Sequence, residues 1–268
     1  MSDNIFENSV IVTSFASDHW DKFANKTVSS MRKNFEGKII CYIDPPHTNI
    51  KMENIEIIST DIYEKKMKKI IGYESMYKEQ LFKDIDMRDI PKGKKFFWQA
   101  SRFANKIFSI IDALSHSKGS NYLIWIDSDV TIKSDLVDGI KTLNIDPNKY
   151  WSYLMRPGVF PENGFMLFNL KHSKHDEFMD HLESLYMDGN IFKFQEWHDC
   201  FAMNHVANNM EIKYGDIMNN INNLFYNGEM DPANNSEVGN FISHNKGLEK
   251  FSSKKVLTIK NLKKLFKL

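Results

Sequence analysis

Two carboxylates one residue apart follow an apolar run in this 268-residue chain, where segment 122–129 reads Tyr-Leu-Ile-Trp-Ile-Asp-Ser-Asp. The run from Tyr122 to Ile126 predicts a strand buried on both faces, as in parallel sheets covered by helices. Because side chains alternate along an extended segment, Asp127 and Asp129 are expected to point the same way. Oxygen donors beyond the carboxyl end of such a strand suit Mg²⁺ or Mn²⁺ and, through the ion, a diphosphate.

The same acidic segment also has a purely structural interpretation. Asp and Ser side chains bond to nearby backbone groups and are favoured where strands end. The segment alone leaves both interpretations open, so other parts of the chain must distinguish them.

Two cations stand on the helix that leads into this strand. Arg102 and Lys106 are four residues apart on a helix predicted over residues 96–116, with Gln99 on the same side. Like charges at this spacing disfavour an isolated helix by a few tenths of a kcal/mol. A shared anion such as a diphosphate would explain the pair, whereas two solvent-facing cations are the alternative.

Further carboxylates occur in two later motifs. Glu162 stands just before Gly164 and an apolar strand over residues 164–169, where a glycine allows close approach of a ligand to the backbone. Glu196 and Asp199 are three apart on a helix expected to begin at Glu196, so they would share a face. The alternatives are an ordinary turn at Glu162 and acids favoured by the helix dipole at Glu196 and Asp199.

A histidine and a lysine follow the Asn-rich stretch 219–240, which is expected to be a long loop. A neutral imidazole at His244 can complete an Asp-containing Mn²⁺ site, and Lys246 can reach phosphate oxygens as a point charge. Most single histidines are not ligands, so the interest of His244 depends on the other motifs.

The elements between these motifs alternate. Apolar runs predict strands over residues 10–15, 38–44, 55–59, 122–126, 150–155 and 164–169. Helical spacing predicts helices over residues 20–35, 96–116, 136–143, 174–188 and 196–208. Such alternation predicts an α/β fold, Rossmann-like, with a mostly parallel central sheet flanked by helices. The charged segment 61–95 breaks the rhythm and is a candidate insertion or lid, or simply a solvated helical hairpin.

Composition indicates one large domain, over residues 1–250, with a basic amphipathic tail over residues 251–268. Lys plus Arg equals Asp plus Glu at 35 each, so net charge identifies no class of partner. The two cysteines do not form a disulfide framework. Without a recognisable leader or a stretch of membrane-spanning length, we expect a cytoplasmic protein.

Taken in order from Val10 to about Gly247, these motifs resemble glycosyltransferases of the GT-A type. Asp127-Ser-Asp129 matches their DxD motif, Glu-Asn-Gly-Phe their glycine-containing acceptor loop, and Trp-His-Asp199 their xED acid. His244 matches their C-terminal histidine. The resemblance implies the GT-A fold and a nucleotide-sugar donor.

The resemblance also implies roles for individual residues. Asp129 and His244 would bind Mn²⁺ or Mg²⁺ directly, and Asp127 would act through the metal or the donor ribose. If the reaction inverts the anomeric centre, Asp199 would be the base and Glu162 would orient the acceptor, with an exchange of these two roles as the alternative. If it retains, Asp199 would lie near the reacting sugar. The remaining donor contacts would be Arg102, Lys106 and Lys246 at the diphosphate, and Thr13, Ser14 and Asp44 at the nucleotide base and ribose.

The expected activity is therefore metal-dependent transfer of a sugar from a nucleoside-diphosphate sugar, a UDP-sugar in the first instance, to an acceptor hydroxyl. The acceptor is open among a glycan, a protein, a lipid-linked sugar and a nucleic acid, and the basic tail is a candidate for peripheral contact with an acidic surface. One alternative is a sugar nucleotidyltransferase, although residues 10–20 lack the Gly-rich phosphate loop that it would need. Another is an inactive nucleotide-sugar or glycan-binding domain of the same fold.

Overall fold

The computed structural model describes residue 6 and residues 8–45, 50, 52–83, 95–156, 158–222 and 231–245, with only the backbone at 95 and 96. Three sequence predictions lie outside this part of the chain: the phosphate contact of Lys246, the tail 251–268, and the 84–94 portion of the candidate lid. No helix in the described ranges combines the length and the apolar composition that a membrane span requires.

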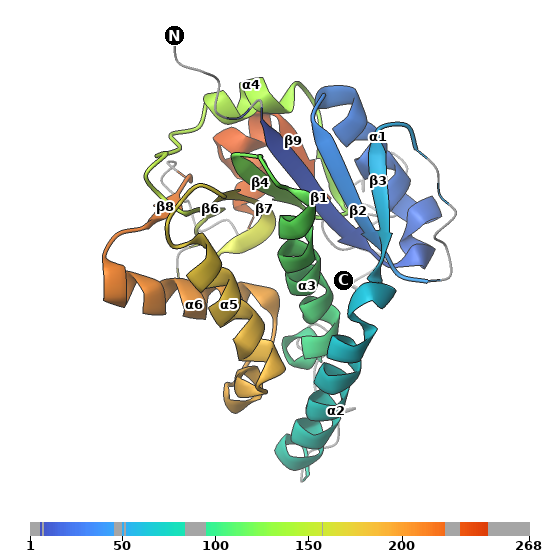
Figure 1. Ribbon diagram of the computed structural model, residues 1–268, viewed down its shortest axis with the longest axis vertical. Helices are drawn as coiled ribbons and strands as arrows, with labels where there is room; N and C mark the ends of the chain where they lie inside the picture. Colours follow the sequence, from blue (N-terminus) through green and yellow to red (C-terminus); the bar gives the residue numbers. More distant parts are fainter. Residues whose placement is uncertain are drawn as a thin grey trace, which may run out of the picture.

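The centre of the molecule is a seven-stranded sheet with the strand order β3-β2-β1-β4-β7-β6-β8 (Figure 1). Its strands are β1 (Ser9–Phe15), β2 (Lys38–Ile43), β3 (Ile55–Ser59), β4 (Tyr122–Ile126), β6 (Trp151–Leu154), β7 (Glu162–Asn169) and β8 (Met218–Asn220). The predicted mostly parallel α/β architecture is confirmed, because every neighbouring pair is parallel except the two that involve β7.

The direction of β7 differs from the parallel alternation expected from the sequence, and it positions the site. β7 runs antiparallel to β4, with Phe165 opposite Ile126. The backbone N–H of Asp127 then donates to Gly164 O at 2.9 Å. The beginning of β7, which carries Glu162, therefore lies beside the carboxyl end of β4.

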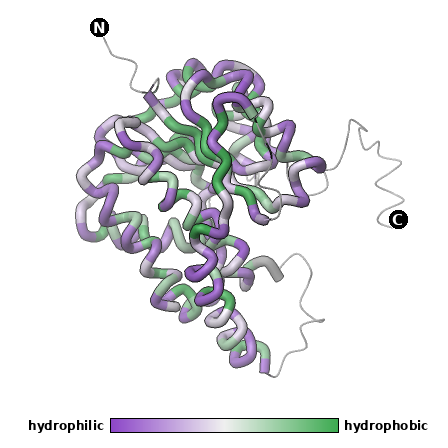
Figure 2. Tube along the Cα trace, turned by 45° about the vertical axis from the view of Figure 1, so that its right-hand side comes forward, coloured by the Kyte–Doolittle hydropathy of each residue, from purple (hydrophilic) through white to green (hydrophobic). Residues whose placement is uncertain are grey.

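The sheet separates two hydrophobic cores, because successive side chains of a strand point to opposite faces. Val10, Val12 and Trp125 belong to one core. Ile11 and Ile124 belong to the other. Nearly all residues of β1 and all residues of β4 are buried, as their apolar runs predict, and Figure 2 shows the hydrophobic segments concentrated in the central strands.

Helices cover both faces of the sheet. Residues of α2 (Glu64–Leu81), α3 (Ala100–His116), α5 (His175–Met187) and α6 (Asp199–Tyr214) pack in the core that holds Trp125. Residues of α1 (Asn25–Asn34), α4 (Leu136–Lys141) and α7 (Pro232–Asn235) pack in the core that holds Ile124. The predicted 20–35 helix begins as a π-helical turn, Trp20–Ala24, before α1.

Helix α2 occupies residues 64–81 of the segment 61–95, which the sequence left open between an insertion or lid and a solvated helical hairpin. It packs along α3, with Ile70 buried in the core (Figure 1). Its buried Glu74 accepts a hydrogen bond at 2.6 Å from the backbone N–H of Ser101, one of the N–H groups that the start of a helix leaves without an intrahelical partner. Residues 64–81 thus form part of the body and cap the helix that carries Arg102 and Lys106.

A second, two-stranded sheet brings the end of the described chain to the acidic motif. β5 (Val130–Ile132) pairs antiparallel with β9 (Ile242–His244), with Val130 opposite His244. The stretch 219–240, expected to be one long loop, contains the end of β8, α7 and a 3-10 helix, Glu237–Asn240, and its residues 223–230 lie outside the description.

Candidate active site

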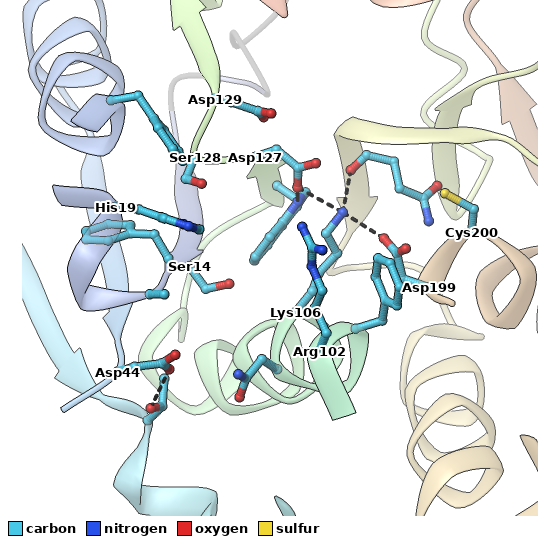
Figure 3. A pocket seen from close by; sticks show the side chains of 18 of the residues that line it. Ser14, His19, Asp44, Arg102, Lys106, Asp127, Ser128, Asp129, Asp199 and Cys200 are labelled. Atoms are coloured by element: carbon cyan, nitrogen blue, oxygen red, sulfur yellow. Dashed lines mark hydrogen bonds and ion pairs between the residues drawn. The ribbon is translucent and has the colours of Figure 1, made fainter. Parts of the chain in front are cut away.

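A cavity of about 630 Å³ opens beyond the carboxyl ends of β1, β2 and β4. Figure 3 shows Ser14, His19 and Asp44 on one side, Asp199 and Cys200 on the other, and Lys106 and Asp127 between them. This volume suits a small-molecule ligand. The lining residues come from the ends of β1, β2 and β4, from the helical turns that follow β1 and β3, from α3, from the start of β7 and from the start of α6.

The acidic motif forms a turn. β4 ends at Ile126, and the N–H of Val130 donates to Asp127 O at 3.0 Å. The shared direction of Asp127 and Asp129 therefore comes from this turn, and the expectation of an extended segment was wrong. Asp127 Oδ1 accepts a hydrogen bond from Trp125 Nε1 at 2.7 Å, which fixes the carboxylate at the strand end.

Asp127, Asp129 and His244 form a group that could hold a metal ion, with ligand atoms within 4.8 Å of one another. His244 Nε2 lies 3.2 Å from Asp129 Oδ1, and both residues are buried. Burial lowers the pKa of His244, but the hydrogen bond and charge of Asp129 outweigh it, so the pKa lies above its usual value. Two carboxylates and one imidazole suit Mn²⁺ as ligands. Mg²⁺ would also fit if water and substrate supplied further oxygen ligands.

The backbone of His244 is held by one side chain. Asn234 Oδ1 accepts from the His244 N–H at 2.9 Å, and Asn234 Nδ2 donates to His244 O at 2.7 Å. Asn234 Nδ2 also donates to Asp231 Oδ2 at 2.6 Å. One amide thus satisfies both backbone groups of His244, as a neighbouring strand would.

Lys106 joins two carboxylates across the cavity. Its Nζ lies 2.8 Å from Asp127 Oδ1 and 2.7 Å from Asp199 Oδ2 (Figure 3). It also donates to the backbone carbonyl of Asn163 at 3.1 Å. The sequence predicted this lysine as a diphosphate contact, and in the structure it already has three acceptors.

The charges of this triad shift three pKa values. Burial lowers the pKa of Lys106, but Asp127 and Asp199 outweigh burial and raise it. Burial raises the pKa of Asp127 above its usual value, although Lys106 opposes the shift. For Asp199, burial raises the pKa, but the charge and hydrogen bond of Lys106 outweigh burial, so the pKa lies below its usual value. Asp199 is therefore ionised at neutral pH.

Asp199 is the first residue of α6, and His198 caps this helix through Nδ1, which accepts from the Phe201 N–H at 3.2 Å. The expectation that the helix begins at Glu196 was wrong, because Glu196 precedes the cap and contacts His198 Nε2 at 2.7 Å. Glu196 and Asp199 therefore do not share a helix face. His198, Asp199 and Cys200 form a second group with metal-ligand spacing, but both nitrogens of His198 have these protein partners.

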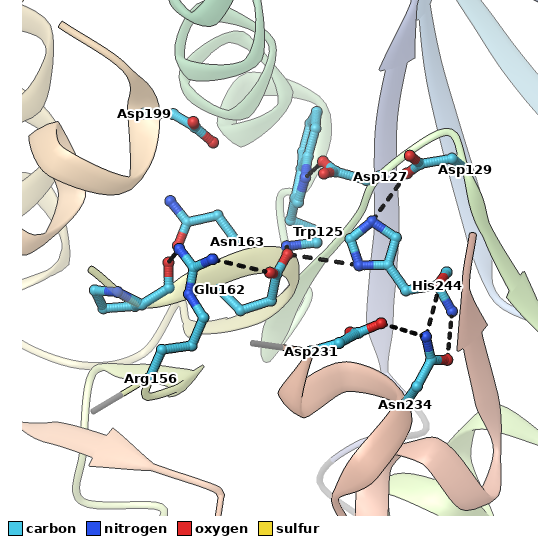
Figure 4. A network of polar contacts seen from close by, with 12 residues as sticks. Trp125, Asp127, Asp129, Arg156, Glu162, Asn163, Asp199, Asp231, Asn234 and His244 are labelled. Carbon is cyan, nitrogen blue, oxygen red and sulfur yellow. Dashed lines mark hydrogen bonds and ion pairs between the residues drawn. The ribbon is translucent and has the colours of Figure 1, made fainter. Parts of the chain in front are cut away.

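Glu162 lines the same cavity from the start of β7. Its Oε1 accepts from the Gly164 N–H at 3.1 Å and lies 3.5 Å from His244 Nδ1. Its Oε2 lies 3.7 Å from Arg156 Nη1. The carboxylate is thus placed between a cation and the imidazole (Figure 4).

The opposite side of the cavity contains most of the residues expected at the nucleotide. Ser14 and Asp44 line it, and Thr60 Oγ1 donates to Asp44 Oδ1 at 2.8 Å. Burial raises the pKa of Asp44. Thr13 does not line the cavity, because its side chain points into the protein interior and is buried. Arg102 lines the cavity and is exposed, with Nη1 3.5 Å from Gln99 Oε1.

Several residues that line the cavity were not predicted from the sequence as site residues. His19 follows β1, Asn105 stands on α3, Asn163 adjoins Glu162, and Cys200 adjoins Asp199. Their positions next to predicted residues, or just after a strand, are the signal that could have identified them. Arg156 and Asn234 carry no such signal, because only the folded chain brings them to Glu162 and His244.

Comparisons with known proteins identify the fold. No protein-family model and no curated protein sequence matches the chain. An active-site mutant of LgtC matches with a TM-score of 0.50 at 13% identity, over 89% of this chain and 87% of that one. LgtC itself, a galactosyltransferase in complex with donor and acceptor sugar analogs, matches with a TM-score of 0.48 at 14% identity, over 89% of this chain and 87% of that one. Mouse xyloside xylosyltransferase 1 matches with a TM-score of 0.44 at 12% identity, over 80% of this chain and 85% of that one.

The likeness at a TM-score of 0.50 shows the fold. This chain has the GT-A architecture that its motifs predict, with a mixed sheet flanked by helices.

Proposed function

We propose that this protein transfers a sugar from a nucleoside-diphosphate sugar, a UDP-sugar in the first instance, to an acceptor hydroxyl with the help of a divalent cation. The observation that carries the proposal is the convergence of Asp127 and Asp129, which line a cavity of about 630 Å³ in a GT-A fold, with the buried His244. The three side chains come from a strand end and from a distant strand, yet their ligand atoms converge.

Within this proposal, Asp129 and His244 bind the cation and Asp127 reaches it or the donor ribose. The cation supplies positive charge to the diphosphate that leaves. Arg102, which is exposed at the cavity, adds a cation that can contact the same diphosphate. A diphosphate contact from Lys106 would require this lysine to give up or share one of its present acceptors.

The nucleotide would occupy the side of the cavity formed by Ser14 and Asp44. The ends of β1 and β2 place both side chains there, with Thr60 fixing the Asp44 carboxylate. A raised pKa at Asp44 reflects its half-buried position, where a hydrogen bond from a ribose or a base would offset lost hydration.

Asp199 would receive the proton of the acceptor hydroxyl if the reaction inverts the anomeric centre. It lies at the opposite side of the cavity, and the Lys106 ammonium keeps it ionised, as a proton acceptor must be. If the reaction retains the configuration, the same carboxylate would lie beside the reacting sugar. Glu162, which also lines the cavity, is the second carboxylate proposed on this side.

The test is release of UDP or GDP from a panel of nucleotide sugars, with and without Mn²⁺ and after chelation. We expect turnover that needs the metal, and we expect Asp129→Asn to abolish both donor hydrolysis and transfer. Asp138→Asn is the matched control, because Asp138 lies on α4 with its side chain 74% exposed. Full activity of Asp129→Asn would contradict the metal site, and metal-dependent UDP binding without turnover would indicate a binding domain.

A further inference from the structure

We infer that Glu162 is a positioning residue for the metal-binding imidazole, and that its Oε1 accepts a hydrogen bond from the Nδ1–H of His244 so that Nε2 faces the cation. This inference rests on the proposed metal site and assigns to Glu162 a role other than orienting the acceptor. It concerns a contact between two buried side chains of β7 and β9.

The two nitrogens of His244 face two different carboxylates. Nε2 lies 3.2 Å from Asp129 Oδ1, and Nδ1 lies 3.5 Å from Glu162 Oε1. Figure 4 shows the ring between the two acids. Nε2 therefore points to the group of candidate ligands, and Nδ1 points away from it.

Nδ1 needs an acceptor. Among the described residues, this buried nitrogen makes no hydrogen bond, and the Glu162 contact of 3.5 Å is long for one. A movement of about 0.5 Å would bring the two atoms to ordinary hydrogen-bond distance. An imidazole that binds a metal through one nitrogen usually donates the proton on the other to a carboxylate, a carbonyl or a water.

Glu162 is itself held in place for this task. Its Oε1 accepts from the Gly164 N–H at 3.1 Å, and Arg156 Nη1 lies 3.7 Å from its Oε2. Arg156 is fixed by hydrogen bonds to two carbonyls, with Nε 2.8 Å from Phe160 O and Nη2 3.1 Å from Pro161 O. With both oxygens engaged, the carboxylate has a defined orientation toward the imidazole.

The glycine of the Glu-Asn-Gly motif makes room for the ring. A Cβ at position 164 would lie 2.6 Å from His244 Cε1 and 2.8 Å from His244 Nδ1. Any side chain here would clash with the imidazole in its present position. The motif thus provides both the carboxylate and the space that the imidazole requires, whereas the sequence pattern had indicated that its glycine allows the approach of a ligand.

The consequence is chemical. A neutral imidazole carries one proton, and a carboxylate at Nδ1 keeps the proton there and leaves the Nε2 lone pair for the metal. Loss of such a partner typically weakens metal binding 10–100-fold. A residue that oriented the acceptor would instead affect the acceptor KM.

The experiment measures the Mn²⁺ dissociation constant of Glu162→Gln by electron paramagnetic resonance of free Mn²⁺, with UDP present and no sugar transfer. We expect the constant to rise about 10–100-fold relative to wild type. In steady-state assays of donor hydrolysis, saturating Mn²⁺ should restore most of kcat. An unchanged Mn²⁺ dissociation constant would overturn the inference.

Two further proteins complete the test. Glu64→Gln is the matched control, since Glu64 is a surface residue of α2 with its side chain 58% exposed, and it should bind Mn²⁺ like wild type. Arg156→Gln removes one support of Glu162 and should raise the constant by a smaller factor, so it replaces Glu162→Gln if that variant fails to fold. If the wild-type protein binds no Mn²⁺, the metal site itself is refuted. If the wild-type protein, Glu162→Gln and Arg156→Gln bind Mn²⁺ equally well, only the role of Glu162 is refuted.

Discussion

The ammonium nitrogen of Lys106 lies 2.7 Å from Asp199 Oδ2, which joins the second turn of α3 to the first residue of α6. Both side chains are largely buried, at 13% and 5% exposure. The same nitrogen contacts Asp127 at the end of β4. One lysine therefore pairs with a carboxylate at the end of β4 and with another at the start of α6, and the geometry of both depends on it.

Lys106→Met should destabilise the protein strongly. The change leaves two carboxylates without their cation, and breaking a buried pair from one side typically costs about 3–5 kcal/mol. The measurement is the free energy of unfolding in urea. Lys68→Met is the control, because the Lys68–Glu64 pair is exposed at 70% and 58% and should contribute less than about 1 kcal/mol. Equal losses in the two variants would refute the importance of burial.

The effect of Lys106→Met should also depend on pH. The folded-state pKa of Asp199 lies below its usual value, so its contribution to stability is present above the unfolded pKa, roughly 3.9, and is lost as pH falls through the folded value. The gap in unfolding free energy between wild type and variant should therefore be largest near neutral pH and shrink in acid. A gap independent of pH would show that the lost interaction is not ionic.

Gly164→Ala should displace His244. The new Cβ would lie 2.6 Å from His244 Cε1, and overpacking of a filled site typically costs about 1–3 kcal/mol. We expect a lower unfolding free energy together with weaker Mn²⁺ binding. Gly72→Ala is the control, because no atom lies within 4 Å of the new Cβ. At this exposed position of α2, alanine should raise the free energy of unfolding by at most about 1 kcal/mol. Tight Mn²⁺ binding by Gly164→Ala would contradict the crowding.

Asn234→Ala should loosen β9. Removal of the amide leaves the backbone N–H and carbonyl of His244 without this partner, and an unsatisfied buried group typically costs about 1–3 kcal/mol. Urea unfolding and Mn²⁺ titration would both report the loss. The neighbouring Asn235, exposed and bonded to Asp231 O, is the control, since Asn235→Ala should change stability by less than about 0.5 kcal/mol.

The two cysteines should react slowly in the native protein. Burial raises the pKa of Cys41 and that of Cys200, so little thiolate is present at neutral pH. A colorimetric thiol titration with DTNB should detect almost no reaction in buffer and both thiols in concentrated guanidinium chloride. Rapid modification of native Cys200, which lines the cavity, would show that its environment stabilises the thiolate.

Local patterns predicted most of the fold. The expected strands over 55–59 and 122–126 have the observed bounds, because a continuous apolar run in 122–126 and an Ile-rich segment in 55–59 each lie between polar residues typical of turns. The direction of β7 was not predictable in this way, since an apolar run is equally compatible with either direction. The start of α6 was misplaced because acids favour a helix start, whereas the actual cap is the His198 imidazole.

The sequence by itself determined which chemical groups are present: two acids after an apolar strand, a lysine on the preceding helix and a histidine further along the chain. All of them are visible as residue types and spacings. Only the tertiary structure decided what each contacts. Pairing of β5 with β9 brought His244 to Asp129, and the reversed β7 brought Glu162 to the other side of the imidazole. Such contacts join segments distant in sequence, and they depend on strand order and direction, which local hydrophobic patterns do not specify.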